Sequence, residues 1–374
     1  MKSGQLARES PAELEVARTD GSFIYDTHRR RYIDFVMGWC VGNLGWRHPA
    51  PWSAARRFNG PDYVYPGYDY KPWHELARLL TAIAPGRLTR CFRATGGSEA
   101  VDLALQAAKL HTGREKFVAV EGAYHGNTLA AIDLAERHTI KPPLDARALQ
   151  RLETQLKRRD VAAFIFEPIS INLGVMVPTT PFMEALPRLC RKYGTLVIAD
   201  EVATGFGRTG TLFASEQFDL APDLMCVAKA MTGGAGGIGA VIASPAVAQS
   251  MEDEKGSFYS TYGWHPRSVD AAIATIRYLS RHKTRLLRSV ATMSDYFRQR
   301  LGAMTFGRPV RLHVRGLAIG LEFEDEDYAD TLQERCRRRG LLVSTEDSSL
   351  LLLPSLIVTR AIAKAGLDIL ERCV

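Results

Sequence analysis

Short, unbroken apolar runs that alternate with helical patterns constrain the fold of this chain most. The runs fall at residues 117–120, 161–166, 196–199, 224–228 and 240–243. Apolar residues recur at helical spacing in three nearby stretches, residues 101–110, 149–159 and 182–193. Strands that alternate with helices form a mostly parallel sheet covered on both faces, and strands buried on both faces are apolar throughout. The middle of the chain is therefore predicted to be an α/β domain.

The pattern changes after His265 and Pro266. A long helical stretch covers residues 267–304, and strand-like segments follow at 309–314, 317–323 and 350–353. A second helical stretch at 329–339 and a terminal helix complete a smaller α+β domain. Strand candidates at 23–25 and 32–34 are expected to join it, which makes this domain discontinuous. The predicted organisation is an N-terminal segment joining the small domain (1–50), a large domain (51–266) and a C-terminal small domain (267–374).

Composition excludes several classes of protein. With 374 residues, 46% of them hydrophobic and 24% charged, the chain is long enough for two sub-domains. No apolar run approaches the roughly 18–20 residues that span a bilayer, so no membrane partner is expected. Residues 1–20 lack the apolar stretch of a secretory signal, and a cytoplasmic location is expected. The six cysteines form no C-x-x-C pair, so neither a metal site nor a disulfide framework is predicted.

The net charge of +7 raises the question of a nucleic-acid partner. The chain has two blocks of arginines, at residues 29–31 and 335–339. Both lie within stretches of mixed charge, which is typical of solvated surfaces. No zinc-finger, helix-turn-helix or RNA-binding pattern accompanies them. A nucleic-acid partner is therefore not expected, and the basic excess suits an enzyme whose ligands are phosphates and carboxylates.

Two ionisable residues end neighbouring apolar runs. Asp200 follows residues 196–199, and Lys229 follows residues 224–228. Ligands of open parallel sheets bind beyond the carboxyl ends of the strands, so both side chains are predicted to face one site. A lysine that leaves an apolar strand loses solvent and becomes a better nucleophile, and a carboxylate can keep a ring nitrogen protonated. The pair suits pyridoxal phosphate, although a buried ion pair without any ligand is the alternative for these two residues alone.

A glycine turn supplies a candidate phosphate site. Residues 95–100 read Thr-Gly-Gly-Ser-Glu-Ala and precede the helical pattern at 101–110. The free N–H groups and the dipole of a helix N-terminus attract a phosphate, to which Ser98 adds a hydroxyl donor; an ordinary N-cap by Ser98 is the alternative. Tyr124, which lies between the run at 117–120 and the dipeptide His125-Gly126, can place an aromatic face over a flat ring.

Taken together, these motifs resemble the class III aminotransferases, which are fold-type-I pyridoxal-phosphate enzymes. The resemblance rests, in chain order, on residues 91–100, Tyr124-His125-Gly126, Phe166-Glu167-Pro168, Asp200-Glu201-Val202, residues 204–210, Ala228-Lys229-Ala230, and Ser260-Thr261-Tyr262 through His265-Pro266. The segments 25–35 and 44–49 are also similar to the start of that family. The likeness covers nearly the whole chain, and residues 198–210 combined with Lys229 are highly specific.

The resemblance implies a role for each matching residue. Lys229 is expected to form the Schiff base and to transfer the proton, while Asp200 pairs with the pyridine nitrogen. The implied cofactor contacts also include Tyr124 and Val202 on the two ring faces, Gly97 and Ser98 at the phosphate, and His125 and Glu167 nearby. Thr261 is expected to reach the phosphate of the neighbouring subunit, so the resemblance implies a homodimer.

One departure from that family bears on the substrate. Many members that transaminate amino acids carry an arginine before a C-terminal Pro-Pro-Leu, where it binds the α-carboxylate. Here residues 350–356 read Leu-Leu-Leu-Leu-Pro-Ser-Leu, so either another arginine binds that group or the preferred amine lacks it. Candidate substrate residues are Trp39, Tyr65, Tyr68 and Arg208, although the aromatic residues can belong to the core and Arg208 can brace its loop. The missing arginine and the segment around Trp39 also resemble glutamate-1-semialdehyde aminomutases.

A ping-pong aminotransferase that moves an amino group from an amine or ω-amino donor to a keto acid is the predicted function. An aminomutase that uses the same residues on one substrate is the nearest alternative, and a non-catalytic cofactor-binding homologue is another. The G-x-G-x-x-G pattern at residues 234–239 is not expected to bind a dinucleotide. Such a fingerprint opens a helix, whereas this one leads into the apolar run at 240–243.

Overall fold

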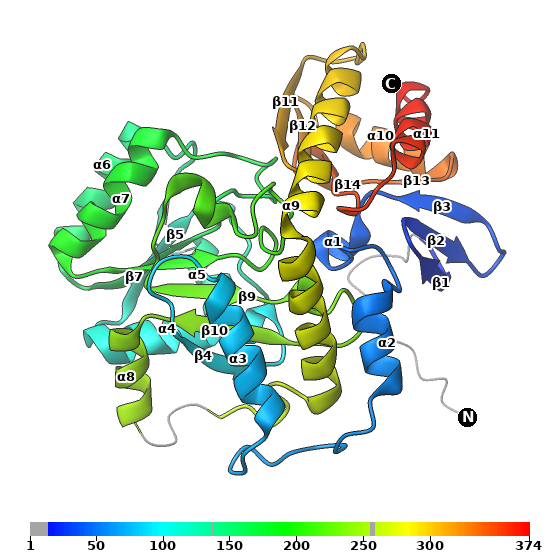
Figure 1. Ribbon diagram of the computed structural model, residues 1–374. Helices are drawn as coiled ribbons and strands as arrows, with labels where there is room; N and C mark the ends of the chain where they lie inside the picture. Colours follow the sequence, from blue (N-terminus) through cyan, green and yellow to red (C-terminus); the bar gives the residue numbers. More distant parts are fainter. Residues whose placement is uncertain (1–13, 137, 255–258) are drawn as a thin grey trace, which may run out of the picture.

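A seven-stranded mixed sheet holds the strands that the apolar runs predict (Figure 1). The computed structural model describes residues 14–136, 138–254 and 259–374, and the strand order is β4-β10-β9-β8-β7-β5-β6. The bounds are β4 Arg90–Ala94, β5 Lys116–Val120, β6 Thr139–Ile140, β7 Val161–Phe166, β8 Leu196–Asp200, β9 Leu224–Val227 and β10 Gly239–Ala243. Strands β5 to β9 are parallel, whereas β10 runs antiparallel to both of its neighbours, β4 and β9.

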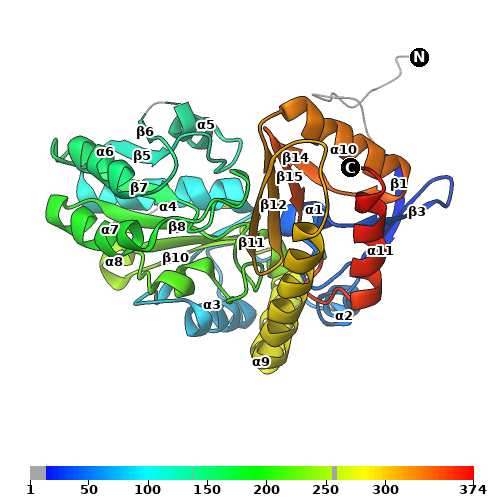
Figure 2. The ribbon, with the colours of Figure 1, turned by 90° about the horizontal axis from the view of Figure 1, so that it is seen from above.

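Helices cover both faces of this sheet (Figure 2). The apolar side chains of α4 (Gly97–Thr112), α5 (Leu129–Glu136) and α8 (Pro245–Asp253) share one core cluster with the strands. On the opposite face, α6 (Ala146–Leu156) and α7 (Thr180–Tyr193) form a second cluster. Every residue of β7, β8, β9 and β10 is buried, which explains why these strands are apolar except for Asp200 at the end of β8.

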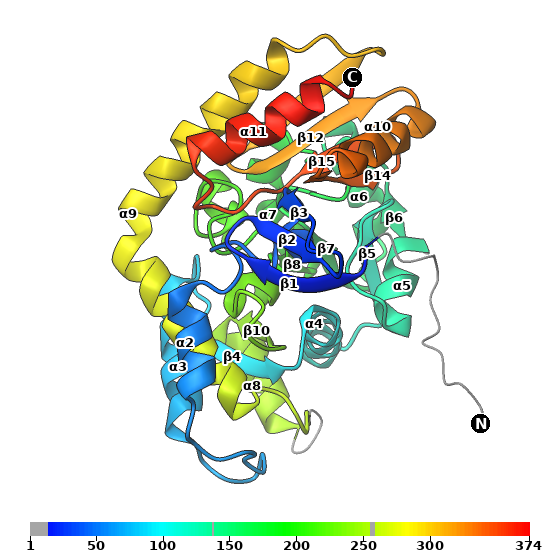
Figure 3. The ribbon, with the colours of Figure 1, turned by 90° about the vertical axis from the view of Figure 1, so that its right-hand side faces the viewer.

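Two smaller sheets lie beside the large one (Figure 3). The first contains β1 Val16–Asp20, β2 Phe23–Asp26, β3 Arg31–Asp34 and β13 Leu341–Leu342. The second contains β11 Val310–Arg315, β12 Ala318–Phe323, β14 Ser344–Glu346 and β15 Ser349–Leu352. Because β3 pairs with β13, the N-terminal strands lie against the C-terminal region of the chain. Residues 1–13 of the predicted N-terminal segment lie outside the described residues, and the domain boundaries stay a prediction.

The remaining helices connect these parts. They are α1 Met37–Cys40, α2 Pro49–Arg57, α3 Lys71–Ile83, α9 Pro266–Gly302, α10 Glu326–Arg338 and α11 Arg360–Glu371, with 3₁₀ turns η1 Ala214–Phe218 and η2 Lys229–Met231. The long helix α9 packs against α3 on the large sheet and against β11 in a smaller one. It therefore fixes how the large sheet and the C-terminal sheet face each other (Figures 1 and 2).

Sequence patterns miss two strands of the large sheet. The edge strand β4 contains two arginines and pairs only with β10, so it lacks the continuous apolar run of a central strand. The other edge strand, β6, has only two residues. The strand predicted at 224–228 ends one residue earlier, at Val227. The backbone leaves the regular strand conformation at Ala228 and turns sharply at Lys229.

Candidate active site

A cavity of about 850 Å³ lies at the carboxyl ends of β5, β7, β8 and β9. The segments that follow these strands contribute Tyr124 and His125, Glu167, Asp200 and Lys229 to its wall. Thr95, Gly96 and the first two residues of α4, Gly97 and Ser98, also line it. Most of the predicted site residues therefore line one cavity. The sequence had predicted only that they follow strands at the same edge of the sheet.

Lys229 occupies an unusual backbone conformation at this edge. Its φ of +42° lies in the left-handed region, which residues with a side chain adopt rarely. The residue begins the 3₁₀ turn η2 directly after β9 and Ala228, and it lines the same cavity as Asp200. Strained backbone of this kind persists only where the surrounding fold holds it, and it often marks functional residues.

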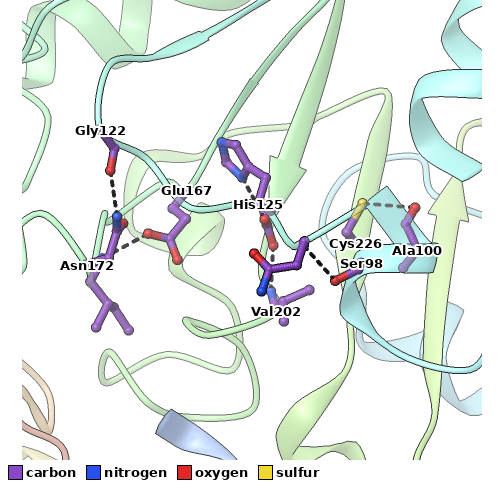
Figure 4. A network of polar contacts seen from close by, with 11 residues as sticks. Ser98, Ala100, Gly122, His125, Glu167, Asn172, Val202 and Cys226 are labelled. Carbon is purple, nitrogen blue, oxygen red and sulfur yellow. Dashed lines mark hydrogen bonds and ion pairs between the residues drawn. The ribbon is translucent and has the colours of Figure 1, made fainter. Parts of the chain in front are cut away.

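Asp200 is held by two donors at the end of β8. Its Oδ2 lies 2.8 Å from Nδ1 of His125, and its Oδ1 accepts a hydrogen bond of 3.0 Å from the Val202 N–H (Figure 4). Both side chains are buried, with exposed fractions of 0% for His125 and 4% for Asp200. The other ring nitrogen, Nε2 of His125, is buried and has no partner among the described residues. The contacts fix the direction of the carboxylate before any ligand binds.

The N-terminus of α4 faces the same cavity. Its N-cap is Gly96, whose φ of −171° is extended, so the alternative that Ser98 is an ordinary N-cap is wrong. Ser98 instead accepts a hydrogen bond from the N–H of Asn127 at 3.3 Å (Figure 4). Gly97 packs directly on Val202, because a Cβ built at Gly97 would lie 2.9 Å from Cγ1 of Val202. The turn thus brings helix N–H groups and Val202 together at one wall.

Glu167 is a buried carboxyl group after β7. Its Oε2 accepts a hydrogen bond of 3.0 Å from the N–H of Ile171 (Figure 4). Burial raises the pKa of Glu167 well above its ordinary value of 4.5, and the nearby charge of Asp200 raises this pKa further, while that of Lys229 lowers it. A carboxyl group that retains its proton so readily can donate a hydrogen bond inside the cavity.

Trp39 and Tyr124 both line the cavity. Trp39 belongs to α1, a turn in which all four residues, from Met37 to Cys40, have positive φ values between 49° and 68°. The carboxylate of Asp34 stabilises the start of this left-handed turn by accepting hydrogen bonds of 2.8 Å from the N–H groups of Val36 and Met37. Tyr124 is half exposed at the rim.

Four predicted residues do not line this cavity. Tyr65 and Tyr68 lie on the segment between α2 and α3, with exposed fractions of 50% and 70%, and Thr261 is also exposed. Arg208 is fully buried, and its guanidinium donates to the carbonyls of Leu317 and Pro354 and to Asn43 Oδ1. The structure corrects the expectation that Arg208 contacts the substrate, because all three acceptors belong to the surrounding fold.

Several wall residues were not predicted from the sequence. Asn172 comes from the turn after β7, and Ser344, Thr345 and Glu346 form strand β14. No motif marks these positions, since β14 reaches the cavity only through the packing of the C-terminal sheet against the large one. Gly234, Gly236 and Gly237 also line the wall, and this segment leads into strand β10, which confirms the strand predicted at 240–243.

The described ranges hold no group of three or more His, Cys, Asp or Glu side chains that could ligate a metal ion. Within the same ranges, none of the helices combines the length and the apolar character that crossing a bilayer requires.

Comparisons with known proteins agree with this geometry. The family model described as aminotransferase class-III matches residues 5–145 and 140–374. Acetylornithine aminotransferases of Methanosarcina mazei and Methanothermobacter thermautotrophicus are 32% and 33% identical to this chain over 96% and 94% of it, and over 91% of their own lengths. The putrescine aminotransferase of Pectobacterium atrosepticum is 29% identical over 93% of this chain and 80% of its own length.

Solved structures show the same fold. The omega transaminase from Pseudomonas jessenii in complex with PMP has a TM-score of 0.92 at 24% identity, with 99% of this chain and 95% of that chain covered. The taurine:2-oxoglutarate aminotransferase from Bifidobacterium kashiwanohense, in complex with PLP and glutamate, has a TM-score of 0.90 at 25% identity and covers 100% and 94%. This protein is therefore a fold-type-I enzyme that depends on pyridoxal phosphate. It belongs to the class III aminotransferase family and is an aminotransferase.

Proposed function

We propose that this aminotransferase accepts donors with a terminal or distal amine and passes the amino group to a keto acid. The observation that carries this proposal is that Lys229 and Asp200 line the same cavity. Its other described wall residues include no lysine or arginine that could bind a substrate carboxylate. Leu351, in the region where relatives carry a carboxylate-binding arginine, is buried in an apolar cluster beside Trp39. Relatives named for acetylornithine and putrescine support a donor of this kind.

The chemistry of the donor set fits pyridoxal phosphate. Bound there, the cofactor supplies an aldehyde that links to amines and a ring that draws electrons from the carbon bearing the amino group. The amine of Lys229 would hold the aldehyde, and the carboxylate of Asp200 would pair with the ring nitrogen. Gly97 and Ser98 at the N-terminus of α4 would bind the phosphate, because unpaired helix N–H groups attract anions. Val202 and Tyr124 would enclose the ring.

Lys229 has two tasks in this proposal. Its amine would hold the cofactor between turnovers, until the amine of an arriving donor takes its place. Once free, the Lys229 amine would accept a proton from the substrate carbon and deliver it to C4′ of the cofactor, which is general base and general acid catalysis by one group. Asp200, held by His125, keeps its carboxylate directed at the ring nitrogen throughout. Glu167 stands beside both groups and can donate a hydrogen bond.

A homodimer and a cytoplasmic location complete the proposal. Support for the dimer comes from a group of exposed tyrosines near Thr261. Tyr63 lies with its ring centroid 5.9 Å from that of Tyr262, and Tyr65 and Tyr68 form a second pair at 5.3 Å. Exposed aromatic groups of this kind mark interaction surfaces. Thr261, which is exposed and does not line this chain's own cavity, would reach the phosphate of the neighbouring site.

The test is a half-reaction followed by absorbance. Purified wild-type protein with pyridoxal phosphate should be yellow, and a suitable amine should convert the cofactor spectrum to that of the amino form without any keto acid. Lys229→Ala should lose the covalent link and nearly all turnover, and Asp200→Asn should retain partial cofactor binding while the proton step slows severely. A colourless wild type that stays unchanged after cofactor addition would contradict the proposal. Repeated turnovers without an added keto acid, beyond the single equivalent of product that the half-reaction releases, would favour the aminomutase instead.

A further inference from the structure

Two hydrogen-bond acceptors in the cavity wall have no donor among the described residues. Oδ1 of Asn172 is buried and has no hydrogen-bond partner among the described residues, and the residue as a whole is only 8% exposed. The carboxylate of Glu346 forms no ion pair or hydrogen bond within the described ranges, and the residue is partly buried. Both residues border the main cavity and an adjacent one of about 690 Å³. A buried acceptor without a donor is costly, so Oδ1 of Asn172 requires an explanation, and the partly buried Glu346 carboxylate is available to the same ligand.

The orientation of the Asn172 amide is fixed. Its Nδ2 donates a hydrogen bond of 2.8 Å to the carbonyl of Gly122 (Figure 4). A reversed amide would place two oxygen atoms against each other, because a carbonyl can only accept. Oδ1 of Asn172 is therefore the atom that remains for a ligand.

A tight hairpin holds Glu346 close to the segment that carries Asn172. Glu346 pairs with Ser349 across a two-residue turn, in which Asp347 adopts a φ of +46°. A Cβ built at Gly174 would lie 2.7 Å from Oγ of Ser349, and one built at Gly320 would lie 2.3 Å from the carbonyl of Gly174. The turn at residues 172–174 and the β14–β15 hairpin are thus in direct contact.

We propose that Asn172 Oδ1 and the Glu346 carboxylate bind a second, positively charged ammonium at the far end of the donor. An ammonium group offers three N–H donors and no acceptor, so it satisfies both groups at once. The preferred donors are then α,ω-diamines. This inference rests on the proposed function, since it assumes that the first amine of the donor reacts at Lys229.

Charge in the two cavities defines the competing class of donor. Burial and the neighbouring charge of Asp347 both raise the pKa of Glu346, as expected for a carboxylate that lacks a cation. The adjacent cavity, however, is also lined by Arg298, Arg311 and Arg315. Donors that end in a carboxylate are therefore the competitors that the experiment must include.

The experiment measures the half-reaction of the holoenzyme with three donor classes of equal chain length: α,ω-diamines, monoamines and ω-amino acids. Wild type should use diamines with a kcat/KM about tenfold above that of monoamines, the effect of one partly screened charged hydrogen bond. Glu346→Gln should remove this preference by raising the KM for diamines about tenfold more than the KM for monoamines. Asp347→Asn is the matched control, because it removes one charge from the same hairpin; it should retain or slightly increase the diamine preference. Glu346→Lys should shift the preference towards ω-amino acids.

The outcomes separate the two proposals. If amines react but wild type shows no diamine preference, or if Glu346→Gln lowers kcat/KM equally for diamines and monoamines, the ammonium subsite is refuted and the proposed function stands. If wild type prefers ω-amino acids, the second cavity selects a carboxylate and the subsite is also refuted. If no amine of any class converts the cofactor, the proposed function itself fails and the subsite fails with it.

Discussion

Replacing Arg208 with leucine should destabilise the fold without changing substrate affinity. The guanidinium is fully buried and donates hydrogen bonds of 2.8 Å and 2.6 Å to the carbonyls of Leu317 and Pro354, and one of 2.6 Å to Oδ1 of Asn43. These acceptors come from three distant parts of the sequence. Leucine would leave all three without this donor in the interior.

The magnitude follows from these contacts. Three bonds of about 1–1.5 kcal/mol each amount to roughly 3–4.5 kcal/mol. Burial lowers the pKa of Arg208, which shows that the charged form is desolvated, and removal of that charge offsets part of the loss. A net loss of about 3 kcal/mol remains. With an unfolding entropy of about 2.1 cal/mol/K for each of the 374 residues, the melting temperature should fall by about 4 °C.

The assay combines thermal unfolding followed by circular dichroism with KM measurements on the folded protein. Arg208→Lys is the matched control, because it keeps the charge but lacks the planar fork that spans several acceptors; it should show an intermediate loss. A melting temperature equal to that of wild type, together with a tenfold increase in KM for donor or acceptor, would refute the bracing role and restore Arg208 as a substrate residue.

Three further changes test the cavity. His125→Phe should lower kcat about 10- to 100-fold by removing a hydrogen bond to the Asp200 carboxylate, while the absorbance of the Lys229-linked cofactor persists; unchanged kcat would exclude this role. Gly97→Ala should weaken cofactor affinity about tenfold, because the new Cβ meets Val202. Gly96→Ala is the control, since its new Cβ meets nothing within 4 Å, and titration with the cofactor should give the same affinity as wild type. Because the folded pKa of Glu167 is raised, the native state binds the extra proton and its stabilising contribution is lost as pH rises above 4.5 through the folded pKa. Cofactor-free Glu167→Gln should therefore lose less stability than wild type over that range, and parallel pH profiles of melting temperature would contradict this.

Much of the fold is visible in the sequence because strands buried on both faces must be apolar. This requirement identifies β7 at its observed bounds and β5, β8, β9 and β10 to within one residue. It does not identify β4, whose arginines are tolerated at a sheet edge, and it does not reveal that β10 inserts antiparallel between β4 and β9. Strand order depends on which segments pair across long sequence distances, and no local pattern carries that information.

By itself, the sequence determined that a lysine and an aspartate follow two apolar strands and that a glycine turn opens a helix. In an α/β sheet these positions converge, because parallel strands present their carboxyl ends at one edge. Only the tertiary structure decided that Arg208 braces the fold, that Asp200 is held by His125, and that Asn172 and Glu346 meet at one cavity wall. Each of these depends on contacts between segments far apart in the chain, and the free energy of such contacts is set by burial and geometry that a one-dimensional pattern does not contain.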